Sequence, residues 1–217
     1  TILLGLLSLP FLILPSKYLR KPICIWIAGI FLFLKYICKI THEVQGTDNI
    51  PKKAVLVASK HQSAFETFAL FYYLPKSVFI HKKQLFLIPI FGQYLKKISM
   101  ISIDRKGGAS TMRLMLKETK KKLLSGFSII IFPEGTRKKI GETPDYKTGL
   151  IGLYKELHTE ILPIALNSGK CWPKNIFIKN PGHIIIRFLP LIDSKLDRKK
   201  ILMEVQERIE TATNNII

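Results

Sequence analysis

The chain has 217 residues, enough for one domain with a substantial hydrophobic core, and hydrophobic residues make up 47% of it. It carries 34 lysines and arginines against 15 acidic residues, a formal net charge of +19, which indicates an anionic partner such as nucleic acid, anionic lipid or an acidic carrier protein. The 3 cysteines form no Cys-x-x-Cys pair and the 5 histidines lack metal-ligand spacing, so a disulfide framework and a structural zinc site are both disfavoured.

The N-terminal part contains two apolar runs, residues 2–15 and 23–40, separated by a basic segment at 17–21. Pro22 suits the first position of a second helix. A membrane span needs about 20 apolar residues, and the first run is shorter. If both helices crossed, their basic ends would lie on opposite sides, contrary to the usual cytoplasmic bias. We therefore expect residues 1–40 to form a helical hairpin in one leaflet, rather than two spans.

A secretory signal peptide is the alternative for the first run. The second apolar run and the absence of a small-residue cleavage site count against it.

From Thr41 onward the pattern changes to short apolar runs alternating with amphipathic segments, which predicts a separate α/β domain over residues 41–217. A weak strand followed by a turn is expected at residues 44–50. Further strands are expected at residues 54–60, 78–80, 99–103, 127–131, 161–166 and 184–189, with helices at 64–73, 110–124, 149–158 and from 197 onward. The apolar stretch 84–92 fits either core packing or a surface that faces acyl chains or the bilayer.

The strand expected at residues 54–60 is followed by His61 and, five positions later, by Glu66. If the strand-to-helix turn curls back, the carboxylate can hold one imidazole nitrogen and fix the tautomer. The other nitrogen would then be free to take a proton from a hydroxyl. Taken alone, such a pair is more often structural than catalytic.

The hexapeptide Phe-Pro-Glu-Gly-Thr-Arg, residues 132–137, leaves the end of the strand expected at 127–131. Strand exits are where α/β proteins tend to place ligand sites. Arg137 offers a planar fork of donors to a carboxylate or a phosphate. The alternative is a surface turn in which Glu134 and Arg137 form a weak ion pair.

Together these two segments resemble the first and third motifs of the glycerolipid acyltransferases, most closely the 1-acyl-sn-glycerol-3-phosphate acyltransferases that make phosphatidic acid. Residues 103–105 resemble the second motif, and residues 162–164 with 167–169 resemble the fourth. The four occur in the family's order from Ala54 to Gly169. The family usually has Asp where this chain has Glu66, which is one methylene longer.

The resemblance implies a mixed β-sheet covered by helices, with the motifs gathered at one end. It implies that His61, held by Glu66, removes a proton from the free hydroxyl of lysophosphatidic acid, which then attacks the thioester of acyl-CoA or acyl carrier protein. The residues that it implies for substrate binding are Arg105 and Arg137 for the acceptor phosphate, Glu134, Gly135 and Thr136 for shaping the site, and Pro163 for lining or supporting the acyl pocket. The amide of Gly135 or Thr136 would help an oxyanion.

No metal or organic cofactor is needed for this chemistry. The protein is expected at the cytoplasmic face of a membrane (the inner membrane, if the source is bacterial), in contact with anionic lipid.

Two other functions stay open. A related acyltransferase could use glycerol-3-phosphate, another lysophospholipid or an amino lipid as acceptor, and the motifs hardly separate these. A non-enzymatic basic protein could bind nucleic acid or membrane. The basic residues are scattered and not interleaved with aromatic residues, which disfavours nucleic acid, while the apolar N-terminal part fits a membrane better.

Overall fold

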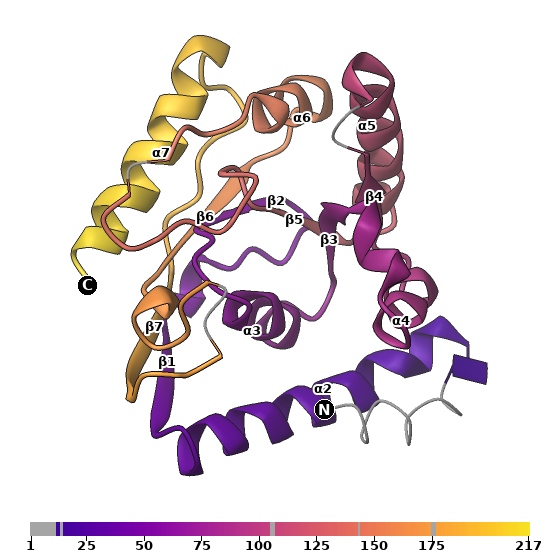
Figure 1. Cartoon of the computed structure of the whole chain (residues 1–217). Coiled ribbons are helices and arrows are strands. Elements are labelled where there is room, and N and C mark those ends of the chain that lie inside the picture. The colour runs from indigo at the N-terminus through magenta and orange to yellow at the C-terminus, as the bar shows by residue number, and fades with distance from the viewer. Residues whose placement is uncertain (1–11, 14, 105–106, 143, 175–176) are drawn as a thin grey trace.

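A seven-stranded sheet lies at the centre of the protein, with strand order β1-β7-β6-β2-β5-β3-β4 (Figure 1). The computed structural model describes residues 12–13, 15–104, 107–142, 144–174 and 177–217. The strands are β1 Ile40–Gln45, β2 Leu56–Ser59, β3 Ser77–Lys82, β4 Ile101–Ile103, β5 Ser128–Ile131, β6 Ile161–Leu166 and β7 Gly182–Phe188. Neighbouring strands are parallel except β6 and β7, so β1 and β7 run opposite to the other five.

The central strands form where the sequence has uninterrupted apolar runs. Every residue of β2 and β6 is buried, as is typical of parallel strands covered on both faces. In the register between β2 and β5, Leu56 lies opposite Ile129 and Ala58 opposite Ile131. This pairing aligns the carboxyl ends of β2 and β5 at one edge of the sheet.

Helices cover both faces of this sheet. They are α2 Ser16–Tyr36, α3 Phe65–Tyr73, α4 Phe91–Lys97, α5 Gly108–Leu124, α6 Gly149–Leu157 and α7 Arg198–Asn214. In the view of Figure 1, α2 and α3 lie below the central strands, and α5, α6 and α7 lie above them. The expected α/β fold with a mixed sheet covered by helices is therefore confirmed.

The first strand lies earlier than expected. β1 begins at Ile40 and ends at Gln45, whereas the prediction placed a weak strand and a turn over residues 44–50. The ladder ends because Gly46 adopts a left-handed conformation, with φ of 70°, and a 3-10 turn over Thr47–Asn49 follows.

Helix α2 runs through Pro22 without a break, so the expectation that a helix starts at this proline was wrong. Leu19, one turn before the proline, is fully buried. Arg20 donates a hydrogen bond of 3.0 Å from Nη2 to the carbonyl oxygen of Leu74, just after α3. These contacts hold the first turns of α2 in place although Pro22 removes one helical hydrogen bond.

The first helix of the expected hairpin would fall almost wholly on residues 1–11 and 14, which lie outside the described part of the chain. Across the described ranges, no helix combines the length and the apolarity that a membrane crossing requires.

The apolar stretch 84–92 divides between the two interpretations given above. Leu85 and Phe86 pack against the hydrophobic core. Leu87, by contrast, is 80% exposed, and Ile88 and Phe91 are exposed beside it. Leu85 and Phe86 thus fix the stretch to the core, and Leu87, Ile88 and Phe91 are left exposed to solvent or to a membrane.

Candidate active site

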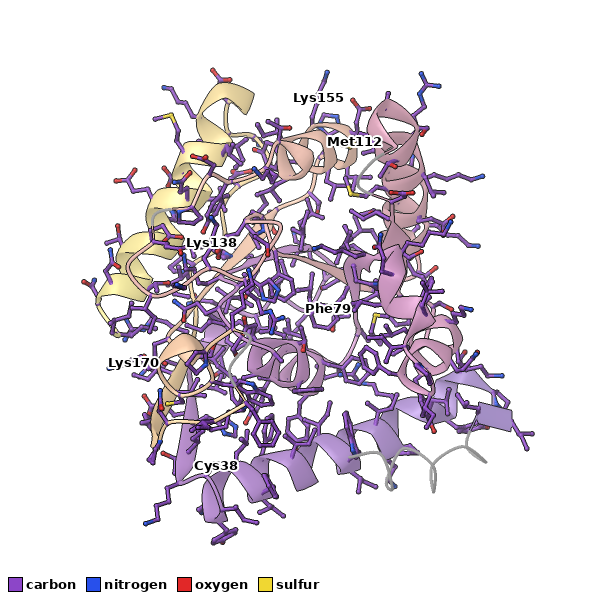
Figure 2. All side chains as sticks on the ribbon, viewed as in Figure 1. Cys38, Phe79, Met112, Lys138, Lys155 and Lys170 are labelled. Atoms are coloured by element: carbon purple, nitrogen blue, oxygen red, sulfur yellow. The ribbon has the colours of Figure 1, made fainter. Side chains whose placement is uncertain are left out.

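The carboxyl ends of β2, β5 and β6 meet at one edge of the sheet, and the segments leaving them form the site. His61 follows β2, and Phe132 follows β5. The two rings stack, with 3.9 Å between their centroids and 14° between their planes. Phe79 of β3, which lies near the centre of the molecule in Figure 2, stacks in turn on Phe132, with centroids 5.9 Å apart. The imidazole is therefore held flat against an aromatic face, and 15% of its side chain remains exposed.

The structure brings His61 and Glu66 together. His61 Nδ1 lies 2.9 Å from Glu66 Oε1, and Glu66 is fully buried. A carboxylate only accepts hydrogen bonds, so the proton of the neutral imidazole belongs on Nδ1 and the lone pair on Nε2. The arrangement thus provides a base at Nε2.

Four further donors surround the Glu66 carboxylate. The backbone N–H groups of Gln62 and Ser63 each donate to Oε1 at 2.7 Å. The hydroxyls of Ser63 and Ser168 each donate to Oε2 at 2.8 Å. Burial alone would raise the pKa of Glu66, but the hydrogen bond and charge of His61 and the bonds from Ser63 together hold this pKa below its ordinary value. Glu66 is therefore a fixed negative charge at the Nδ1 side of the imidazole.

Glu134 faces inward instead of pairing with Arg137, so the surface ion pair considered for the hexapeptide was wrong. Its Oε1 accepts the backbone N–H of His61 at 2.7 Å and lies 3.6 Å from the ammonium of Lys60. Burial raises the pKa of Glu134 to about 7, although Lys60 and the His61 amide act in the opposite direction. Glu134 thus attaches the hexapeptide to the main chain of His61.

Arg137 forms no ion pair with any other described residue. Within the described ranges, no carboxylate lies within 4.0 Å of its guanidinium. The next residue, Lys138 (labelled in Figure 2), donates its backbone N–H to the carbonyl oxygen of His61 at 2.8 Å. Arg137 therefore lies one residue from a direct contact with the His61 main chain and has a guanidinium available for an anion.

The amides of the hexapeptide differ in their availability. Gly135 adopts φ of 70°, and its N–H donates to the carbonyl oxygen of Phe132 at 2.9 Å, so this amide is engaged in the turn. The N–H of Thr136 has no hydrogen-bond acceptor among the described residues. Of the two amides considered for an oxyanion, only the one of Thr136 thus has no acceptor among the described residues.

Two of the predicted site residues, Pro163 and Arg105, have no described contact with His61. Pro163 is buried within β6, opposite Ala58 of β2, so it packs beside the strand that leads to His61. Arg105 lies outside the described residues.

Sequence reasoning gave no role to three residues that contact the site. Ser168 binds Glu66, and Phe132 stacks on His61. Lys60, only 2% exposed, approaches Glu134 and Glu210 from the end of β2. A signal existed for each, because all three stand next to the ends of adjacent parallel strands, but their contacts depend on a strand order that the sequence did not reveal.

This fold and this site define an acyltransferase. Residues 41–167 match the model of the Acyltransferase family, and the chain belongs to that family. The resemblance drawn from the motifs is thereby confirmed, and the alternative of a non-enzymatic basic protein is set aside.

Similar proteins carry a more specific name. The 1-acyl-sn-glycerol-3-phosphate acyltransferase of Pseudomonas aeruginosa is 31% identical over 185 residues, which cover 85% of this chain and 72% of that protein. The enzyme of the same name from Borreliella burgdorferi is 30% identical over 86% of this chain and 73% of its own. The crystal structure of the 1-acyl-sn-glycerophosphate acyltransferase of Thermotoga maritima matches with a TM-score of 0.77 at 23% identity, covering 93% of this chain and 80% of that one, and so supports the fold.

We predict that Ser168→Ala lowers kcat roughly tenfold to a hundredfold with little change in either KM. A charge-assisted hydrogen bond contributes about 1.5–3 kcal/mol, and 1.4 kcal/mol corresponds to about tenfold. The Ser168 hydroxyl bonds Glu66 and not a substrate, so the loss should appear in the chemical step. Ser125→Ala, at the exposed end of α5, is the matched control. Steady-state kinetics in which Ser168→Ala keeps the wild-type kcat would contradict this role.

Proposed function

We propose that this enzyme transfers a fatty acyl group from acyl-CoA or acyl carrier protein to the free hydroxyl of 1-acyl-sn-glycerol-3-phosphate, giving phosphatidic acid for phospholipid synthesis. The observation that carries the proposal is His61, whose Nδ1 is held by the buried Glu66 while Nε2 remains a base. The names of the relatives from Pseudomonas aeruginosa and Borreliella burgdorferi support the same acceptor.

The proposed reaction runs as a single displacement. Nε2 of His61 takes the proton of the acceptor hydroxyl, and the oxygen attacks the thioester carbonyl carbon. The C–S bond of the tetrahedral intermediate breaks, and the leaving thiolate recovers the proton from the imidazolium. General-base help of this kind is typically worth about 10²–10⁴-fold. The fixed charge of Glu66 stabilises the imidazolium, and the Thr136 amide is a donor for the oxyanion.

The acceptor phosphate is assigned to Arg137 and Arg105. A phosphate monoester carries close to two negative charges near neutral pH, so a pair of arginines is chemically reasonable. The guanidinium of Arg137 has no carboxylate within 4.0 Å in the described part of the chain and lies one residue from the Lys138–His61 contact, which supports this role. Glu134 and Gly135 shape the turn that carries Arg137, and Pro163 supports the neighbouring strand beside an acyl pocket.

Membrane attachment is assigned to residues 1–40, as a hairpin in one leaflet at the cytoplasmic face. Helix α2 supports this assignment because it has two apolar faces. Ile27 and Leu34 pack into the core, whereas Ile25, Leu32 and Phe33 are exposed. The net charge of +19 adds attraction to anionic lipid.

Purified protein incubated with radiolabelled lysophosphatidic acid and each donor tests the function. We expect phosphatidic acid to form, and His61→Ala to abolish its formation, because the variant lacks the base but keeps the buried carboxylate. His158→Asn is the matched control, since this exposed histidine adopts a left-handed conformation that asparagine tolerates. More than a small residual rate in folded His61→Ala would refute the assignment of the base.

Replacing Arg137 should weaken use of the acceptor more than use of the donor. A lost charge-assisted contact of about 1.5–3 kcal/mol corresponds to a rise in acceptor KM of roughly tenfold to a hundredfold. Arg137→Lys keeps the charge but loses the bidentate geometry, so it should also raise this KM. Lys155→Ala, on the exposed side of α6, is the control. If Arg137→Ala changes only the melting temperature and leaves both KM values unaltered, the residue has no role in phosphate binding.

Cysteine labelling tests the hairpin. In a variant that lacks Cys24, Cys38 and Cys171, a single cysteine at Lys21 would be exposed to a membrane-impermeant maleimide. We expect it to react from the same side of sealed vesicles as a control cysteine at Glu207, on the exposed side of α7. Reaction of the Lys21 site only from the opposite side would show that the segment crosses the bilayer.

A further inference from the structure

Lys60 is the residue directly before His61, yet its side chain is buried to 2% exposure. Its ammonium lies 2.8 Å from both carboxylate oxygens of Glu210, on the last turns of α7 and 150 positions away in sequence. It also lies 3.6 Å from Oε1 of Glu134. One buried cation is thus shared by two carboxylates from distant parts of the chain.

Such a cluster needs an explanation other than stability. Burying charged groups is costly unless they are paired, and well-packed apolar side chains often replace a buried ion pair with no loss of stability. The explanation lies in a second contact of Glu134: the same Oε1 that faces Lys60 accepts the backbone N–H of His61.

A tyrosine extends the cluster to the segment that follows the hexapeptide. Tyr146, which is 5% exposed, donates its hydroxyl proton to Oε1 of Glu210 at 2.9 Å. Its neighbour Lys147 donates its backbone N–H to the carbonyl oxygen of Pro133 at 2.8 Å. The hexapeptide is therefore held on one side by its own glutamate and on the other by the Tyr146 segment.

We propose that Lys60 and Glu210 are positioning residues for acyl transfer. Lys60 keeps the Glu134 carboxylate on the His61 backbone N–H and so fixes where the imidazole stands, while Glu210 holds Lys60 in place. This inference rests on the proposed role of His61 as the base.

The charges around Glu134 make the proposal measurable. Glu134 faces Lys60, the His61 amide, Glu210 and Glu66. Its second oxygen has no hydrogen-bond partner in the described part of the chain. Burial raises its pKa to about 7, Lys60 lowers this pKa, and the two other glutamates raise it. The ionised form, the stronger acceptor for the His61 N–H, is therefore gained as the pH rises through about 7.

The two positioning residues have opposite charges, so removing them should shift the acid limb of the kcat profile in opposite directions. Lys60→Met removes the cation, which raises the pKa of Glu134 and moves the limb to higher pH by about one unit or more. A higher pKa of Glu134 lowers its ionised fraction at pH 7, so kcat at this pH should fall severalfold and recover at higher pH. Glu210→Gln removes a negative charge, so the limb should move to lower pH.

The experiment measures kcat against pH at saturating substrates for the purified full chain, with a melting curve for each variant. Lys52→Met and Glu207→Gln are matched controls, since both residues are exposed and Glu207 lies on the same helix as Glu210. If Lys60→Met does not fold, Glu210→Gln decides alone, because its amide can still accept bonds from Lys60 and Tyr146.

Opposite displacements of the acid limb, or a displacement to lower pH by folded Glu210→Gln alone, would support the proposal. Acid limbs that coincide with the wild type, or that move in the same direction, would overturn it. Failure of the proposed function would look different, because the wild type would then make no phosphatidic acid or His61→Ala would remain active.

Discussion

The site depends on the carboxylate of Glu66, which is buried away from solvent. Glu66 is fully buried and must remain charged to orient His61, a state that is costly without compensating hydrogen bonds. Five donors supply them: the imidazole, two backbone N–H groups and two hydroxyls. Glu66 also stands in the first turn of α3, where the helix dipole favours a negative charge. The turn between β2 and α3 is therefore folded around this one group.

The extra methylene of Glu66, relative to the Asp usual in the family, is accommodated by the same turn. One oxygen of this side chain contacts both the imidazole and the backbone of the turn, and the other oxygen contacts Ser168 after β6. The carboxylate thus joins two strand ends, and the catalytic geometry is linked to the pairing of β2 with β6.

His61 is fixed twice, by its side chain and by its main chain. Glu66 and the face of Phe132 hold the ring. The Glu134 carboxylate accepts a hydrogen bond from the backbone N–H of His61, and the Lys138 amide donates one to the carbonyl oxygen of His61. Because Glu134 and Lys138 belong to one segment, the turn after β5 binds both main-chain polar groups of His61. Such preorganisation limits the motion of the imidazole, as the proposed role of His61 as a base requires.

The sequence predicted the parts of this arrangement that depend on local pattern. The central strands were predictable because their apolar runs are uninterrupted, and the spacing of His61 and Glu66 suggested a contact that the structure contains. The partners from distant segments were not predictable. Ser168 is 102 positions from Glu66, and only the order of β6 beside β2 brings them together.

Glu134 is a second residue whose partners could not be predicted from the sequence. Sequence proximity suggested Arg137 as its partner, but the folded chain offers a buried lysine and a backbone N–H that the sequence did not place nearby. The helix expected to begin at Pro22 was misjudged for a related reason, since burial of Leu19 and the hydrogen bond of Arg20 outweigh the local preference of proline.

The most direct test of the account is the tautomer of His61, read from the nitrogen chemical shifts of protein labelled with 15N-histidine. The chain has 5 histidines, and a His61→Gln variant assigns the relevant pair of signals. The account predicts that the neutral imidazole carries its proton on Nδ1, toward Glu66, and leaves Nε2 as the base. A neutral His61 protonated on Nε2, with Nδ1 bare, would contradict it.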